Sequence, residues 1–270
     1  MKHFIVSLLV LTLVFFWVTG KGDTAFFKVK QLGTESYNKI SEGTSTPIVA
    51  TSTNATTTPV KVVSHIKTPE HVKAIYMSSW VAGTPSVREN LIKLIEDTGL
   101  NAVVIDVKDN TGVLSWEGRI RDIDELIEEL HAKNIYVIAR IAAFQDPAYI
   151  ERNPGSAVTN INTGKIWRDR KGEPWVDTGS VAMWEYLGSL GKETYARGFD
   201  ELNYDYIRFP TDGDLRAMRF PISGERGLTD KRTIVRDFYK YLHETFSPLG
   251  IPISGDVFGI ITTNANETKT

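Results

Sequence analysis

Short apolar segments alternate strictly with longer amphipathic segments from about residue 72 onward, and this alternation restricts the possible folds more than any other feature. The segments with the composition of strands are 72–77, 102–107, 135–142, 201–207 and 253–257. Amphipathic helices are expected from Pro85 to Gly99, around Ile123 to Leu130, at 181–197 and at 229–246. Strands and helices in strict alternation predict a parallel sheet with right-handed crossovers.

The first of these helices shows the local signals on which the assignment rests. Ser86 and Glu89 have the spacing of a capping box at a helix N-terminus, and Gly99 is a typical stop. Its apolar positions, which we expect to face the core, are Val87, Leu91, Leu94 and Ile95.

Two architectures can hold such a sheet, the doubly wound sheet and the (β/α)8 barrel. Long segments follow the third and fourth strands, the first of them rich in Asn, Pro and Gly, at the ends where a barrel carries its functional loops. No GxGxxG or GxxxxGK[ST] motif follows an expected strand, which disfavours a nucleotide-binding doubly wound sheet. We therefore predict an α/β fold of the TIM-barrel type. A complete barrel has eight strands in about 250 residues, so residues 71–270 are expected to supply about the first five β/α units.

The first seventy residues have a different character. Residues 1–20 combine Lys2 with the apolar run from Phe4 to Val18, which predicts a signal peptide or an uncleaved signal anchor. Residues 21–70 include tracts of Ser, Thr and Pro that cannot bury enough apolar surface to order themselves, and we expect a flexible linker. The protein is therefore expected outside the cytoplasm, either secreted or held at the membrane by its N-terminal segment.

Composition removes several kinds of chemistry. The chain has no cysteine, which rules out disulfides, thiolate nucleophiles and cysteine-based zinc sites. Its histidines form neither an HxH nor an HExxH motif, and we expect no metal and no cofactor. The 31 basic and 33 acidic residues are scattered along the chain, so no nucleic-acid partner is expected, and a neutral or weakly charged substrate fits better.

Charged side chains recur where the expected strands end, which in a barrel is where the active site forms. The residues at these ends are Asp106 and Lys108, then Arg140, then Asp205 and Arg208, and finally Asp256. Two carboxyl groups flanking a glycosidic bond can cleave it, one as nucleophile or base and one as proton donor. Arg208 close to Asp205 would favour the charged form of that carboxylate, and we predict Asp205 as the nucleophile.

Several of these positions are predicted to contact substrate rather than to react. Aromatic rings bind the C–H faces of sugars, and the candidates in loops near strand ends are Trp80, Trp167, Trp175 and Tyr206. The polar candidates are Asp106, Lys108, Arg140 and Arg208. For Asp106 and Lys108 the alternative is an ion pair with each other or with a neighbouring strand.

Residues 200–210, DELNYDYIRFP, resemble the fourth-strand signature of a bacterial family of glycoside hydrolase domains of uncharacterised function, related to the α-amylase-like barrels. Residues 142–147 and 175–179 resemble segments of the same family. The resemblance implies that the nucleophile is Asp205 and that the proton donor is Asp256, at the end of the fifth strand. The α-amylase-like barrels usually have Glu at the donor position.

The leading hypothesis is therefore a glycoside hydrolase, of the retaining type, that cleaves a cell-wall or extracellular polysaccharide or oligosaccharide. The alternative is a catalytically inactive barrel that binds glycans or serves as a scaffold for envelope proteins. A phosphate-binding metabolic barrel would have a Gly-rich loop after its seventh or eighth strand and a cytoplasmic location, and the expected export segment disfavours it.

Overall fold

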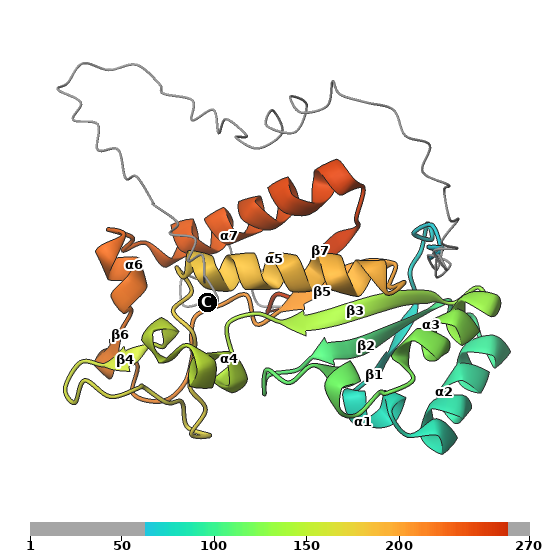
Figure 1. The fold of residues 1–270 in the computed structure, drawn as a ribbon, viewed down its shortest axis with the longest axis horizontal. Coiled ribbons are helices and arrows are strands. Elements are labelled where there is room, and N and C mark those ends of the chain that lie inside the picture. The colour runs from blue at the N-terminus through green and yellow to red at the C-terminus, as the bar shows by residue number, and fades with distance from the viewer. Residues whose placement is uncertain (1–62, 259–270) are drawn as a thin grey trace, which may run out of the picture. The chain divides into compact units, whose positions relative to one another are not determined.

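The computed structural model describes residues 63–258 (Figure 1). The expected export segment at residues 1–20, and the expected linker up to residue 62, lie outside the described residues. Within 63–258, no helix has the length and apolar character needed to cross a bilayer.

A five-stranded parallel sheet lies at the centre of the domain. Its strands are β1 (Ala74–Met77), β2 (Ala102–Lys108), β3 (Tyr136–Ala142), β5 (Glu201–Asp205) and β7 (Ile253–Gly255). They are neighbours in that order, so the strand order follows the chain and never reverses as it does in a doubly wound sheet. Among the described residues β1 and β7 do not pair with each other. The fold is thus α/β with a parallel sheet in barrel order, and these strands do not close a barrel.

Helices join successive strands, and two long insertions follow β3 and β5 (Figure 1). The α-helices are α1 (Ser79–Ala82), α2 (Pro85–Asp97), α3 (Ile123–Ala132), α4 (Pro147–Arg152), α5 (Val181–Ala196), α6 (Pro221–Glu225) and α7 (Lys231–Phe246). Short 3-10 turns occur at Ser115–Glu117, Pro154–Ser156, Leu215–Ala217 and Ser247–Leu249. The two insertions pair through the antiparallel strands β4 (Thr159–Asn160) and β6 (Met218–Arg219).

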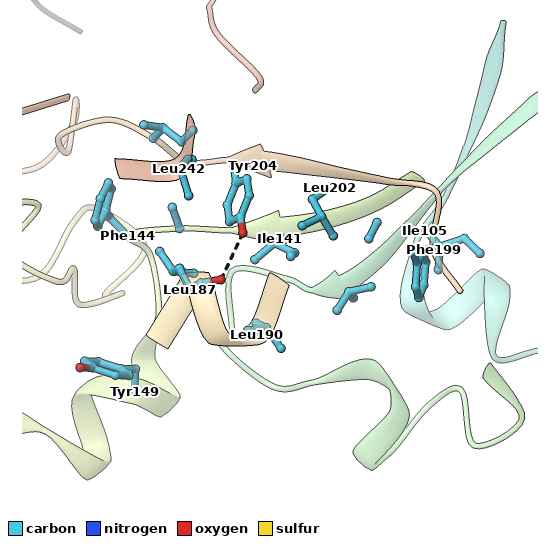
Figure 2. Close-up of a cluster of buried hydrophobic side chains, with 14 of the residues drawn as sticks. Ile105, Ile141, Phe144, Tyr149, Leu187, Leu190, Phe199, Leu202, Tyr204 and Leu242 are labelled. Carbon is cyan, nitrogen blue, oxygen red and sulfur yellow. Dashed lines mark hydrogen bonds between the residues drawn. The ribbon is translucent and has the colours of Figure 1, made fainter. Parts of the chain in front are cut away.

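The helices pack on one face of the sheet, as in a barrel. The outward-facing side chains of the strands and the buried faces of α2, α3, α5 and α7 form the main core. Figure 2 shows part of it, where Leu187 of α5 lies near Ile141 of β3 and Leu202 of β5. The buried hydroxyl of Tyr204 donates to the Leu187 carbonyl at 3.1 Å, which satisfies its polar group inside this core (Figure 2). A smaller cluster on the opposite face of the sheet contains Ala102, Tyr136 and Ile138.

The buried face of α2 differs from the predicted one. Val87 and Leu94 are 43% and 42% exposed, whereas Ile92, Ile95 and Arg88 are buried. Arg88 reaches the core side because its guanidinium donates to the Asp122 carboxylate and to the Ala82 carbonyl. The spacing of apolar residues treats Arg88 as solvent-facing. It therefore predicts the wrong buried face for α2.

The expected capping box of α2 does not form. The helix begins at Pro85 with Thr84 as its N-cap, so Ser86 lies inside the first turn. Thr84 makes no side-chain cap bond, because its hydroxyl donates to the carbonyl of Trp80 in α1 at 2.8 Å. The contact of Thr84 with α1 therefore takes the place of a side-chain cap at the start of α2.

Residues 63–68, which we call the N-terminal clasp, pack against the sheet although they were predicted to be part of the linker. The amide of Ile66 donates to the buried carboxylate of Asp200 at 2.7 Å, and the hydroxyls of Thr68 and Tyr136 lie 2.9 Å apart. The side chain of Ile66 joins the small cluster on the inner face of the sheet. The ordered domain therefore includes residues before position 71.

The clasp is expected to loosen in acid because of His65. Its ring stacks on Tyr195 at 3.8 Å, and its Nδ1 lies 3.8 Å from Asp200, which also contacts His131 at 3.0 Å. Burial lowers the pKa of His65 by more than the Asp200 charge raises it. A lowered pKa in the folded state means that docking is fully favoured above about pH 6.5 and weakens as the pH falls through the folded-state pKa.

Hydrogen exchange of the Ile66 amide, corrected for the intrinsic rate, tests this expectation on the full chain. Protection should fall between pH 7 and pH 5 in the wild type, and His65→Phe, which keeps a stacked ring, should remove that change. An unchanged pH dependence in His65→Phe would contradict the assignment to His65.

Candidate active site

Arg140 on β3 joins three carboxylates at the carboxyl ends of the strands. Its Nη1 donates to Asp106 Oδ1 of β2 at 2.6 Å, and its Nη2 donates to Asp205 at the end of β5. Its Nε lies 3.9 Å from Asp256 Oδ2, just beyond β7. Asp106 and Arg140 are direct register partners, as are Ala142 and Asp205. The parallel sheet thus brings three acidic residues to one guanidinium, although the first and the last of them are 150 positions apart in the chain.

One guanidinium faces three carboxylates in this cluster. Burial alone would lower the pKa of Arg140, but the hydrogen bonds and charges of Asp106 and Asp205 outweigh it and raise that pKa. Within residues 63–258, no group of three or more His, Asp or Glu side chains has an arrangement that could hold a metal ion. The cation at the centre of the carboxylates is the arginine itself.

Tyr76 of β1 belongs to the cluster, although the sequence did not single it out. Its hydroxyl donates to Asp106 Oδ2 at 2.5 Å, and burial followed by that hydrogen bond raises its pKa. The phenol therefore stays protonated and holds Asp106 from the side opposite Arg140. The available signal was the alternation along β1, since Tyr76 shares the inner face with Asp106 through the pairing of β1 with β2.

Asp205 is fixed by the local backbone. Tyr206 has a φ of 54°, which ends β5 at Asp205 instead of at the predicted residue 207. The left-handed conformation costs a residue other than glycine about 1–2 kcal/mol, and such strain is concentrated at functional sites. It aims the amide of Tyr206 at Asp205 Oδ1, 2.5 Å away. Both carboxylate oxygens of Asp205 thus accept a hydrogen bond, one from Tyr206 and one from Arg140.

Asp256 is held less tightly than Asp205. Its amide donates to the Tyr204 carbonyl at 2.9 Å, and its Oδ1 accepts a 3.2 Å hydrogen bond from Asn203 Nδ2. The same Asn203 amide nitrogen lies 3.1 Å from Ser254 Oγ. The Asp256 side chain is 51% exposed, and its contact with Arg140 is long, at 3.9 Å. Asn203, which sequence reasoning missed, is the residue that orients it.

A cavity of about 550 Å³ opens beside the two predicted catalytic carboxylates. It lies between the ends of β5 and β7 and the exposed side of α7, and its lining residues are Asp205, Ile207, Arg208, Arg232, Val235, Arg236, Tyr239, Asp256, Val257 and Phe258. Burial, and then the charges of Asp256 and Asp205, raise the pKa of Tyr239. The cavity is large enough for a sugar unit, and only the packing of α7 could reveal that Tyr239 lines it.

A second and smaller cavity, of about 70 Å³, lies under the two insertions. Its lining residues are Asn110, Gln145, Asp169, Lys171, Trp175, Tyr206, Arg208, Thr211 and Asp212. Asp169 organises it by accepting hydrogen bonds from Trp175 Nε1 at 3.1 Å and Gln145 Nε2 at 3.3 Å. Trp175, Tyr206 and Arg208, all predicted substrate contacts, therefore lie together, and Arg208 lines both cavities.

Lys108 does not face these cavities. Its side chain is 0% exposed, and its Nζ donates to the equally buried Asp146 at 2.8 Å. Simple alternation would place Lys108 on the same face as Asp106, but the register with β3 shifts between these two residues. This β-bulge turns Lys108 under the insertion that follows β3. Lys108 therefore fits the alternative reading, an ion pair with a residue near the end of a neighbouring strand, since Asp146 follows β3.

The predicted tryptophans differ in their surroundings. Trp167 is buried, and its Nε1 donates to the Asp214 carbonyl at 2.9 Å, so it ties the two insertions together and presents no open ring face. Trp80 is 66% exposed on α1, and the Arg119 guanidinium covers its ring at 3.4 Å. Neither lines the two cavities, whereas Trp175 lines the smaller one.

Asp177, within the 175–179 segment, connects the two insertions. Its buried carboxylate accepts hydrogen bonds from the Ser223 hydroxyl, from the Ser223 amide at 3.0 Å and from the Gly179 amide at 3.0 Å. Gly179 has no room for a side chain, since a Cβ there would lie 2.4 Å from Ser223 Oγ. Asp177 and Gly179 are therefore structural, and they hold α6 in place.

Fold and site together define the class of the protein, an α/β domain whose parallel strands follow barrel order and whose acidic residues meet at their carboxyl ends. The chain belongs to the family described as "putative glycosyl hydrolase domain", whose model matches residues 74–270. A hypothetical protein of known structure from Ruminiclostridium thermocellum is 33% identical, with a TM-score of 0.60 over 69% of this chain and 99% of that one.

More distant structures share the fold alone. The α-L-fucosidase isoenzyme 2 from Paenibacillus thiaminolyticus is 11% identical, with a TM-score of 0.50 over 68% of this chain and 32% of the fucosidase. An α-xylosidase from a soil metagenome is 13% identical, with a TM-score of 0.50 over 67% of this chain and 29% of the xylosidase. No curated protein matches the sequence significantly.

Proposed function

We propose that this domain is a retaining glycoside hydrolase in which Asp205 is the nucleophile and Asp256 the proton donor. The observation that carries the proposal is that both carboxylates contact Arg140 and line the same 550 Å³ cavity. The substrate is a polysaccharide or oligosaccharide outside the cytoplasm, in the cell wall or beyond it. The apolar segment at residues 4–18 supports that location.

The proposed reaction has the two steps of retention. In the first step Asp205 attacks the anomeric carbon, while Asp256 donates a proton to the leaving oxygen, and a glycosyl ester with Asp205 forms. In the second step Asp256 removes a proton from water, which attacks the same carbon and frees Asp205. Arg140 and the Tyr206 amide hold the Asp205 side chain in place. Asp256 is half exposed and lies 3.9 Å from Arg140 Nε, so its side chain is held less tightly than that of Asp205.

The test is cleavage of a panel of cell-wall and storage glycans by the full chain and by Asp205→Asn. We expect the variant to lose on the order of 10⁴-fold in rate with its fold intact, as for removal of a nucleophile. Asp97→Asn, which removes a carboxylate from the exposed Lys93 pair on α2, is the matched control and should cleave like the wild type. Proton NMR of the first product should show the anomeric configuration of the substrate.

The exposed position of Asp256, and Asp in place of the usual Glu, favour one second candidate, a barrel that binds glycan without cleaving it. Glycan binding by the wild type and Asp205→Asn alike, with cleavage by neither, would replace the hydrolase with that candidate. Cleavage that Asp205→Asn leaves unchanged would instead remove Asp205 from the mechanism.

A further inference from the structure

Arg208 is a partly buried guanidinium with no ionic partner among residues 63–258. Only its Nη1 makes hydrogen bonds there, to Thr211 Oγ1 at 3.2 Å and, at 3.5 Å, to the Phe209 carbonyl. No carboxylate oxygen in that part of the chain lies within 4 Å of it. Burial lowers the pKa of Arg208 despite the nearby Tyr206 and Asp205. A charge removed from water without a counter-ion is destabilising, so this arrangement requires a reason.

Other partly buried arginines of this domain do have strong partners. Arg140 binds Asp106 and Asp205, and Arg88 binds Asp122. Arg197, which also lies over a tryptophan, contacts Asp124 at 3.3 Å and Glu193 at 3.2 Å. The missing partner is therefore a property of Arg208 and not a general feature of the arginines here.

Three aromatic rings surround the Arg208 guanidinium. Its Cζ lies 4.9 Å from the ring centroid of Trp175, 5.1 Å from that of Tyr206 and 5.0 Å from that of Phe258. Cation–π contacts of this kind contribute about 0.5–2 kcal/mol and offset part of the desolvation. The rings supply no hydrogen-bond acceptor, and Nε and Nη2 on the edge of the guanidinium have none in the described part of the chain. These two nitrogens form the side that binds a carboxylate with two parallel hydrogen bonds.

The position of Arg208 relates this free edge to the candidate active site. Arg208 lines the large cavity together with Asp205 and Asp256, and it lines the small cavity together with Trp175. It follows Asp205 by three residues, after the turn at Tyr206. A glycan that placed one sugar unit at Asp205 would bring that sugar or its neighbour to Arg208.

We propose that Arg208 binds a carboxylate on the substrate, and hence that the enzyme acts on an acidic glycan that contains uronic acid units. This inference rests on the proposed hydrolase function. It departs from the neutral or weakly charged substrate that the net charge of −2 suggested, because the charge of the whole chain does not report the charge of one cavity. A bound carboxylate supplies the counter-ion that Arg208 lacks.

The binding test uses the full chain and calorimetric titration with the trimers of galacturonic acid and mannuronic acid. Their methyl esters are matched ligands in which an uncharged ester replaces each carboxylate, and glucose 6-phosphate distinguishes a phosphate from a carboxylate. We expect at least one acid trimer to bind about tenfold to a hundredfold more tightly than its ester, as for hydrogen bonds between charged groups. Arg208→Gln should abolish that preference, and Arg208→Lys should keep part of it.

The control variant is Arg119→Gln, which removes an arginine that also stacks on a tryptophan but lines neither cavity. It should leave the preference for the acid trimer unchanged. Equal binding of acid and ester, or a preference that survives Arg208→Gln, would overturn the proposal, and so would tighter binding of glucose 6-phosphate. Selective binding of an acid trimer without turnover would reject the hydrolase but keep the carboxylate site. Cleavage of neutral glycans alone, at the wild-type rate in Arg208→Gln, would keep the hydrolase but reject the carboxylate site.

Discussion

Lys108→Ala is expected to lower the free energy of unfolding by about 3–5 kcal/mol, because the substitution leaves a buried carboxylate without its cation. Lys108 Nζ and Asp146 Oδ2 are 2.8 Å apart and both side chains are 0% exposed. Asp146 cannot turn to solvent, since its Oδ1 caps α4 by accepting from the Tyr149 amide at 2.7 Å. The loss therefore includes both the ion pair and the support of the insertion that follows β3.

Urea unfolding of the full chain, followed by circular dichroism, measures this loss. Lys93→Ala is the matched control, because its pair with Asp97 has a similar distance of 2.9 Å but lies on the exposed side of α2. It should cost less than about 1 kcal/mol. Lys108→Met combined with Asp146→Asn should be more stable than Lys108→Ala, since no unpaired charge remains. A loss in Lys108→Ala no greater than that in Lys93→Ala would show that the buried pair does not stabilise the domain.

Arg140→Met should affect both stability and catalysis. Without the guanidinium, Asp106 and Asp205 lose their shared cation and face each other as like charges. We expect a loss of about 3 kcal/mol in unfolding free energy. Where the variant still folds, glycan cleavage should fall by at least about a hundredfold, as when a preorganised charge is removed from an active site.

Two comparisons separate the effect of Arg140 from a general loss of charge. Arg140→Lys keeps the charge but cannot reach Asp106, Asp205 and Asp256 with one planar group, and it should rescue stability more than activity. Arg197→Met removes an arginine that also binds two carboxylates, Asp124 and Glu193, but at the surface of the helical layer. It should change stability by less than about 1 kcal/mol and leave cleavage unchanged. Wild-type activity in Arg140→Met would contradict the central position that we assign to this residue.

The arrangement of the strand ends could be predicted from the sequence, because parallel strands place their carboxyl ends at one edge. That rule predicts that Asp106, Arg140, Asp205 and Asp256 lie close together, as they do in the structure. The same rule misplaced Lys108, because a single extra residue in β2 changes its face and nothing in the local sequence marks a bulge.

Other features of the site depend on contacts between distant segments. Trp167 has the loop context of a sugar platform, but the carbonyl of Asp214, 47 residues later, draws its indole into the interior. Tyr239 reaches the cavity only because α7 packs beside β7. The clasp could not be predicted for a related reason, because it depends on a distant contact. The composition of the preceding tract predicts a linker and does not show that Ile66 packs on the sheet.

The clasp and the cavities lie at opposite ends of the strands. Ile66 and Thr68 bind at Asp200 and Tyr136, at the amino-terminal ends of β5 and β3, whereas Asp205 and Asp256 lie at the carboxyl ends. None of the residues that line the two cavities is a hydrogen-bond partner of Ile66 or Thr68. The clasp can therefore open and close without breaking a contact of a ligand in the cavities, and the two events need not compete.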